Sequence, residues 1–166
     1  MSTIHSSFCF LKEWNRLMEM FTSDEQEQIT HAISRAESLT SGEIRVVIEY
    51  KVGEGKGVME KASYYFQKLE MHNTIQRNGV LIYIAFHDQV FCVLGDVGIH
   101  KMVGDDFWEE VRNTMLSSFR KGQVLDGLKM GVKRVGEILK GYFPKGDDDI
   151  NELPNDIYFG DKNEGN

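Results

Sequence analysis

Two apolar runs separated by a short polar break dominate the middle of the chain. They cover residues 80–86 and 90–94, and the break consists of His87, Asp88 and Gln89. This spacing predicts a β-hairpin. The first run contains Val-Leu-Ile-Tyr-Ile-Ala without polar alternation, which is typical of a strand covered on both faces. We therefore expect helices on both sides of the sheet to which this hairpin belongs.

Apolar residues at helical spacing predict four helices around the hairpin. The first begins at a capping sequence in residues 22–26 and runs to about Leu39. The second covers residues 58–71, the third begins near Gly104, and the fourth ends before Pro144. Their predicted buried faces consist of Ile29, Ala32, Ile33, Ala36 and Leu39; Val58, Met59, Ala62, Tyr65, Phe66 and Leu69; Phe107, Trp108, Val111, Met115 and Phe119; and Val124, Leu125, Leu128, Val132, Val135, Ile138, Leu139 and Tyr142.

A further strand is predicted at residues 43–50, which are rich in β-branched residues. The helix at 58–71 joins this strand to the one at 80–86, and a helical crossover of this kind joins parallel strands. A β-α-β unit followed by a hairpin gives a small mixed sheet. The predicted fold class is therefore α/β, an α/β/α sandwich with a small mixed central sheet between helices.

The chain of 166 residues has the length of one domain, which we place at residues 22–144. Residues 1–21 carry apolar positions at roughly helical spacing and form either a mobile arm or a docked helix. Residues 145–166 form an acidic C-terminal tail in which only 153–159 has side chains suited to docking. We expect a monomer.

Charge is distributed unevenly along the chain. The formal net charge is −7, and residues 147–166 contain seven acidic residues and one lysine, so the rest of the chain is almost neutral. There is no basic stripe that could follow a phosphate backbone, which argues against nucleic-acid binding. The partner expected is an unknown protein.

The cysteines and the N-terminal sequence bear on the compartment. Cys9 and Cys92 are read as two free thiols in a reducing environment, because one lies near the chain end and the other inside a predicted strand. The longest apolar run near the N-terminus, residues 8–11, is too short for a signal peptide or a membrane span. We therefore expect a cytoplasmic protein that does not bind membranes.

Polar residues should gather at one end of the sheet. If the strands at 43–50 and 80–86 are parallel, their starting ends coincide, which brings Glu43 close to Asn78. The hairpin places Arg77 and Asn78 near Gly95 and Asp96. This end of the sheet is the first candidate for a functional site.

Four carboxylates near that end are candidate metal ligands: Asp96, Asp105, Asp106 and Glu43. Together with a backbone carbonyl such as that of Gly95, they would offer the oxygen ligands that calcium or magnesium prefers. Arg77 and Asn78 would support the site. The alternative reading is structural, because acids at a helix start cap the helix and Gly-Asp after a strand often forms a turn.

The sequence lacks complete motifs for other common metal, catalytic and phosphate-binding sites. The five histidines lack the spacing of a zinc site, and there is no Gly-x-Ser-x-Gly elbow. Residues 147–158 match the first three ligand positions of an EF-hand loop but lack its glycine and its final glutamate. Gly53, Gly55 and Gly57 form a flexible loop without the spacing of a phosphate-binding motif.

Five short motifs occur in one order along the chain, namely TSGEIR at residues 40–45, RNGVLIY at 77–83, GDVGI at 95–99, GDDFW at 104–108 and NELP at 151–154. Together they resemble the TPM domain family, in particular its single-domain bacterial members. The resemblance covers roughly residues 24–159 and implies an α/β sandwich. Family members include a thylakoid lumen protein linked to photosystem repair and described as an acid phosphatase, and bacterial proteins reported to bind calcium or magnesium.

Three functional hypotheses follow. The first is a non-catalytic domain that binds a divalent cation through Asp96 with Asp105 or Asp106 and serves interaction or repair. The second, implied by the resemblance, is a metal-assisted acid phosphatase in which the cation activates water and Arg77 holds the phosphate. The third is a plain protein-interaction module whose acids only cap helices. No residue presents itself as a nucleophile, so catalytic residues are not assigned.

Overall fold

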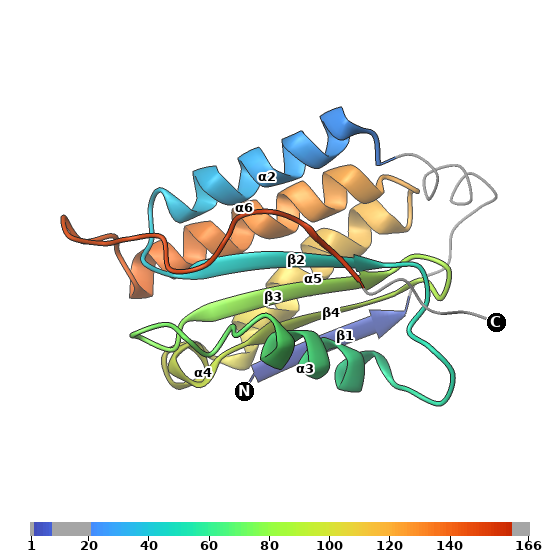
Figure 1. The fold of residues 1–166 in the computed structure, drawn as a ribbon, viewed down its shortest axis with the longest axis horizontal. Helices are drawn as coiled ribbons and strands as arrows, with labels where there is room; N and C mark the ends of the chain where they lie inside the picture. The colour runs from blue at the N-terminus through green and yellow to red at the C-terminus, as the bar shows by residue number, and fades with distance from the viewer. Residues whose placement is uncertain (1, 8–20, 161–166) are drawn as a thin grey trace.

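A mixed β-sheet lies at the centre of the protein (Figure 1). The computed structural model describes residues 2–7 and 21–160, and the sheet in this part of the chain has five strands in the order β1-β4-β3-β2-β5. The strands are β1 (Ser2–Ser7), β2 (Glu43–Glu49), β3 (Gly79–Ala85), β4 (Val90–Gly95) and β5 (Tyr158–Phe159).

The connections between the central strands are those that the sequence predicts. Helix α3 (Val58–Lys68) joins β2 to β3, which run parallel with Glu43 opposite Gly79. β3 then turns into the antiparallel β4. The β-α-β unit, the hairpin and the mixed sheet are therefore confirmed. Because β2 and β3 start where β4 ends, one end of the sheet collects residues 41–43, 77–79 and 95–96. We call this end the rim.

Helices cover both faces of the sheet, which confirms the predicted sandwich (Figure 1). One face packs against α2 (Ser23–Glu37), α4 (Val97–Met102), α5 (Asp105–Phe119) and α6 (Val124–Tyr142), and the other packs against α3. Successive side chains of a strand point to opposite faces. In β3, Ile82 belongs to the first core and Tyr83 to the second. The apolar run of β3 is continuous because both of its faces are buried.

An extended segment follows α6 along the free edge of β2. We call residues 145–160 the C-terminal strap (orange to red in Figure 1). A bridge between Thr40 and Pro144 sets its starting point. Near its end, Tyr158 and Phe159 pair in parallel with β2, and the Gly160 amide donates to the Ile48 carbonyl at 2.8 Å. The strap thus covers the edge of the sheet that would otherwise be open.

Besides β5, the described part of the chain contains two elements that the sequence pattern did not indicate. Residues 2–7 form strand β1, which pairs antiparallel with β4, although their polar composition carries little strand signal. The helix considered within residues 1–21 falls on residues 8–20, which lie outside the described part. The connection before Gly104 is the short helix α4, whose first amide, that of Val97, donates to the Asp96 Oδ1 at 2.7 Å.

Glycines in α6 allow the closest approach between α6 and α2. A Cβ on Gly136 would lie 2.6 Å from the Cβ of Ala36, whereas a Cβ on Gly141 would meet no atom within 4 Å. Both residues lie inside the helix, where glycine is less favourable than alanine by roughly 1 kcal/mol. The two positions therefore differ in packing alone.

We expect opposite effects from the same substitution at these two positions. Gly141→Ala should raise the free energy of unfolding by about 0.5–1 kcal/mol, because it adds helix propensity without a clash. Gly136→Ala should lower it by about 1–3 kcal/mol, because it forces α6 away from α2. Urea denaturation of both variants measures the difference. Equal changes at the two positions would contradict the packing seen between these helices.

Candidate functional site

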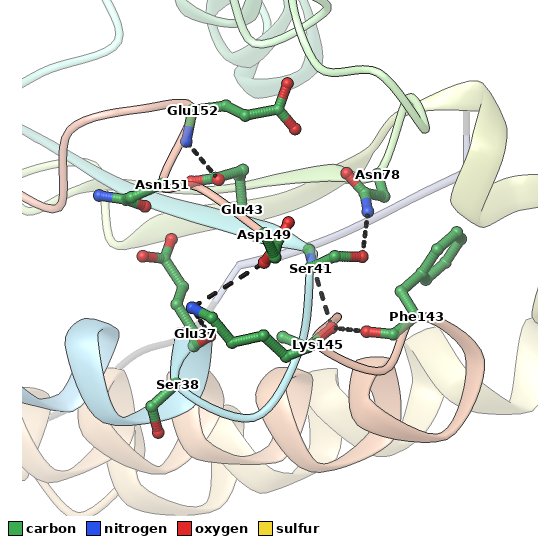
Figure 2. A network of polar contacts seen from close by, with 12 residues as sticks. Glu37, Ser38, Ser41, Glu43, Asn78, Phe143, Lys145, Asp149, Asn151 and Glu152 are labelled. Carbon is green, nitrogen blue, oxygen red and sulfur yellow. Dashed lines mark hydrogen bonds and ion pairs between the residues drawn. The ribbon is translucent and has the colours of Figure 1, made fainter. Parts of the chain in front are cut away.

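The turn between α2 and β2 places two carboxyl groups side by side at the rim. α2 ends at Glu37, and β2 begins at Glu43. The turn is tied to the end of α6, because the Thr40 hydroxyl donates to the Phe143 carbonyl at 2.5 Å and the Ser41 amide donates to the same carbonyl at 2.9 Å. These bonds fix where the chain enters β2 and bring the two carboxyl groups together (Figure 2).

Glu37 is a buried carboxyl group, and only one of its two oxygens accepts a hydrogen bond from a described residue. Its residue is 6% exposed, its Oε1 accepts from the Ile44 amide at 2.7 Å, and its Oε2 is buried without a hydrogen-bond partner. Burial raises the pKa of Glu37 from 4.5 to about 8, and the neighbouring Glu43 carboxyl adds to this increase. Glu37 therefore retains a proton near neutral pH.

Glu43 holds the C-terminal strap by its main chain. Its Oε1 accepts from the Glu152 amide at 2.7 Å, and its Oε2 accepts from the Leu153 amide at 3.3 Å. Burial raises the pKa of Glu43, and the negative charges of Glu152 and Asp149 contribute. The two amide bonds act in the opposite direction because they stabilise the carboxylate.

The strap brings further charged groups toward this carboxyl pair. The Lys145 Nζ lies 3.4 Å from the Glu37 main-chain oxygen and 3.9 Å from the Asp149 Oδ2 (Figure 2). Asp149 is partly buried, with a side chain that is 19% exposed. One lysine therefore faces a cluster of three acids, Glu37, Glu43 and Asp149, and leaves their charges only partly compensated.

Asp96 lies at the rim as predicted, but its carboxylate is already fully engaged. Asp96 is 0% exposed and accepts from the Arg77 Nε at 2.6 Å and the Arg77 Nη2 at 2.8 Å. It also caps α4 through the Val97 amide. The sequence argument correctly placed Arg77 beside Asp96. The resulting bidentate ion pair neutralises the carboxylate that was the central candidate metal ligand.

The remaining predicted site residues occupy separate positions. Asp105 and Asp106 are exposed in the first turn of α5, after Gly104 as the N-cap. Within residues 2–7 and 21–160, no three His, Cys, Asp or Glu side chains form a group that could hold a metal. The predicted set of Asp96, Asp105, Asp106 and Glu43 is therefore not gathered into one cage.

The supporting residues lie close to where they were expected. The Asn78 Nδ2 donates to the Ser41 Oγ at 3.3 Å, and the Asn78 Oδ1 is buried without a hydrogen-bond partner. Gly95 packs under Trp108, where a Cβ would lie only 2.3 Å from the indole ring. These residues fix the geometry of the rim, and Asn78 adds an unused oxygen to it.

Sequence reasoning missed Glu37, although a signal for it exists. Glu37 follows Ile33 by four residues, which places it on the buried stripe of α2, whereas Leu39, which was assigned to that stripe, is 48% exposed. A glutamate on a buried helical stripe is a candidate for a perturbed pKa. Its partner Glu43 was among the predicted residues.

Comparisons with known proteins agree with this fold. The model of the TPM domain family matches residues 15–138. The solution structure of the BA42 protein from the psychrophilic bacterium Bizionia argentinensis is 44% identical, with a TM-score of 0.81, and the match covers 86% of this chain and 98% of that one. No curated protein matches the chain. No helix in the described residues is long and apolar enough to cross a membrane.

Two more distant solved structures share the fold. The N-terminal domain of the cg2496 protein from Corynebacterium glutamicum is 13% identical with a TM-score of 0.60, and the match covers 80% of this chain and 81% of that one. The N-terminal domain of a protein from P. gingivalis is 22% identical with a TM-score of 0.55, covering 74% and 78%. The sandwich therefore persists where most side chains differ.

The raised pKa of Glu37 predicts a pH dependence of stability. Because the folded chain holds this proton more tightly than the unfolded chain, stability should fall as the pH rises from 4.5 to about 8. Glu37→Gln should remove this part of the fall and make the variant more stable than the parent at pH 8, by an amount on the order of 3 kcal/mol.

Urea denaturation between pH 5 and pH 8 measures this difference. Glu54→Gln is the matched control, because Glu54 is exposed in the loop between β2 and α3. Its stability should follow that of the parent at every pH. Parallel curves for the parent and Glu37→Gln would show that Glu37 titrates in the normal range.

Proposed function

The chain belongs to the TPM domain family, and we propose that it is a non-catalytic binding domain for a divalent cation, calcium or magnesium. In this proposal the cation binds at the carboxyl pair Glu37 and Glu43, and its binding serves the recognition of a protein partner. The observation that carries the proposal is the close pair of buried carboxyl groups, Glu37 and Glu43, in which the Glu37 Oε2 accepts no hydrogen bond from any described residue.

The chemistry of this pair favours a hard cation. Calcium and magnesium bind oxygen ligands, and carboxylates are their usual charged ligands in proteins. The raised pKa values of Glu37 and Glu43 reflect burial and negative charge without full compensation. A cation at the pair would supply that compensation and displace the proton held by Glu37. The negative charge of Asp149 on the strap, which acts on Glu43, would add to the attraction for the cation.

The set of Asp96, Asp105 and Asp106 predicted from the sequence stays a competing location. A cation at Asp96 would first have to break two charge-assisted hydrogen bonds to Arg77. The acid phosphatase reading also stays a prediction. There Arg77 was expected to hold a phosphate, whereas two of its guanidinium nitrogens are bonded to Asp96.

Thermal unfolding with calcium, with magnesium and with EDTA tests the proposal. A ligand that binds only the folded chain at one hundred times its Kd stabilises it by about 2.7 kcal/mol. Stabilisation should be larger at pH 8 than at pH 6, because the cation competes with the proton on Glu37. Glu37→Gln and Glu43→Gln should each reduce it strongly.

Asp96→Asn and the double variant Asp105→Asn, Asp106→Asn separate the two locations. They should leave the cation-dependent shift unchanged, as should the exposed control Asp126→Asn. Loss of the shift in the Asp96 or Asp105 and Asp106 variants alone would place the cation at the other location. No shift with either ion in the parent chain would reject cation binding and favour a plain interaction module.

A further inference from the structure

Arg45 is a largely buried residue whose guanidinium has no bonded partner among the residues that the structure describes. It lies on β2 between Glu43 and Val47, on the face that packs against α3, and its residue is 7% exposed. Among the described residues, its Nε is buried without a hydrogen-bond acceptor, and the two terminal guanidinium nitrogens, which form no bond there either, keep access to solvent. A guanidinium nitrogen taken out of water without an acceptor costs free energy, and a carboxylate that bonded it would remove this cost.

The C-terminal strap is attached on either side of Arg45 but not at Arg45 itself. Before it, Glu43 binds the amides of Glu152 and Leu153, and after it, Val47 pairs with Tyr158. Residues 154–157 arch between these two attachments. Asp156 lies on this arch, and its charge acts on Arg45 through space, yet its carboxylate forms no ion pair with the guanidinium.

The strap is attached to the sheet edge with little burial of its own side chains. Among its residues, all of which lie in the described part, only Leu153 is buried. Ile150 is 70% exposed and Phe159 is 45% exposed. Its β-ladder with β2 has two residue pairs. Another extended segment in its place would have to replace the main-chain bonds to Glu43 and Ile48 and the packing of the Tyr158 ring on Tyr65.

We propose that the edge of β2 around Arg45 is a binding site for an extended acidic segment of a partner protein, which displaces the strap. The strap itself shows how such a segment lies: main-chain amides on Glu43, an apolar side chain at the position of Leu153, and a parallel ladder beside Val47 and Ile48. Adding a strand to an exposed sheet edge is a common mode of peptide recognition.

The partner's acid distinguishes it from the strap. A glutamate at the position of Asp156 has one more methylene group, and the proposal expects its carboxylate to bond the Arg45 guanidinium, with which Asp156 forms no ion pair in the described part of the chain. Arginine binds carboxylates in a bidentate manner, and such charge-assisted bonds are stronger than neutral ones. Arg45 therefore selects for an acidic side chain in the partner. Glu43 and the strand pairing bind the main chain of any extended segment. This inference requires no bound cation, so its test can fail or succeed separately from that of the function proposed above.

Peptide binding to the full chain tests the proposal. The host carries Leu153→Ala, which removes the buried anchor of the strap. Two labelled peptides have the sequence of residues 150–160, with glutamate or alanine at the position of Asp156, and fluorescence anisotropy measures their binding. We expect the glutamate peptide to bind about tenfold more tightly, because a hydrogen bond to a charged group contributes roughly 1.5 kcal/mol or more.

Arg45→Met in the same host is the critical variant, because methionine keeps the apolar stem and removes the charge. It should fold, since it deletes a buried charge that has no partner. The two peptides should then bind equally. Arg120→Met, at an exposed arginine after α5, is the matched control and should keep the tenfold difference. Amide resonances of Val47 and Ile48 should shift when the glutamate peptide binds.

A second variant tests Arg45 without any peptide. Asp156→Glu in the otherwise unchanged chain should let the strap reach the guanidinium, raise the melting temperature and weaken peptide binding. Equal affinity of the two peptides for the host, or no binding of either, would overturn the proposal. Host dimers that the peptide dissociates would show that the strap of a second copy occupies the edge, which would replace the partner by this chain itself.

Discussion

Strand β2 buries three charged side chains on the face that packs against α3, and much of the surrounding structure exists to compensate them. Glu43, Arg45 and Glu49 are between 3% and 7% exposed. Unpaired, each would cost more free energy than an ordinary core residue contributes. The sheet can include this strand only because α3 and the C-terminal strap bring hydrogen-bonding groups to its edge.

The three charges are compensated to different degrees. The Glu49 carboxylate accepts from the Tyr83 hydroxyl at 2.5 Å and from the Tyr65 hydroxyl, and lies 3.2 Å from the Lys61 Nζ. Glu43 has the two strap amides but shares its surroundings with the protonated Glu37, and Arg45 has no bonded partner among the described residues. The carboxylate at the Glu49 end of β2 thus has its full set of bonded partners. The buried polar atoms without a partner among the described residues lie toward the rim, on Glu37 and Arg45.

The sequence predicted the parts of this arrangement that depend on local patterns. The polar break 87–89 predicted the hairpin, the helical stripes predicted the two cores, and parallel pairing of β2 with β3 placed Asn78 near Glu43. Arg45 was missed as a functional candidate because its importance comes from a missing partner, which no local pattern records, whereas Glu37 was missed although its place on the buried stripe of α2 signals it. The strap was predicted to be a mostly solvated tail, because its sequence is rich in Asp, Asn and Gly and has few apolar side chains. In the structure, Leu153 is its buried anchor. Its position depends on main-chain bonds to Glu43, which are invisible in side-chain composition.

Glu43 links the two regions in which buried charge is only partly compensated, the carboxyl pair with Glu37 and the edge of β2 around Arg45. Its carboxylate faces Glu37 on one side and holds the amides of Glu152 and Leu153 on the other. A proton or a cation that changes the charge at Glu37 and Glu43 must therefore change the strength of the strap's attachment, because hydrogen bonds to an ionised acceptor are stronger than those to a neutral one. By thermodynamic linkage, a segment that replaces the strap must change the affinity of the carboxyl pair for protons and cations by the same factor. The rim and the edge of β2 are thus coupled through one side chain, and the sign of the coupling depends on whether the incoming group adds negative charge beside Glu43 or removes it.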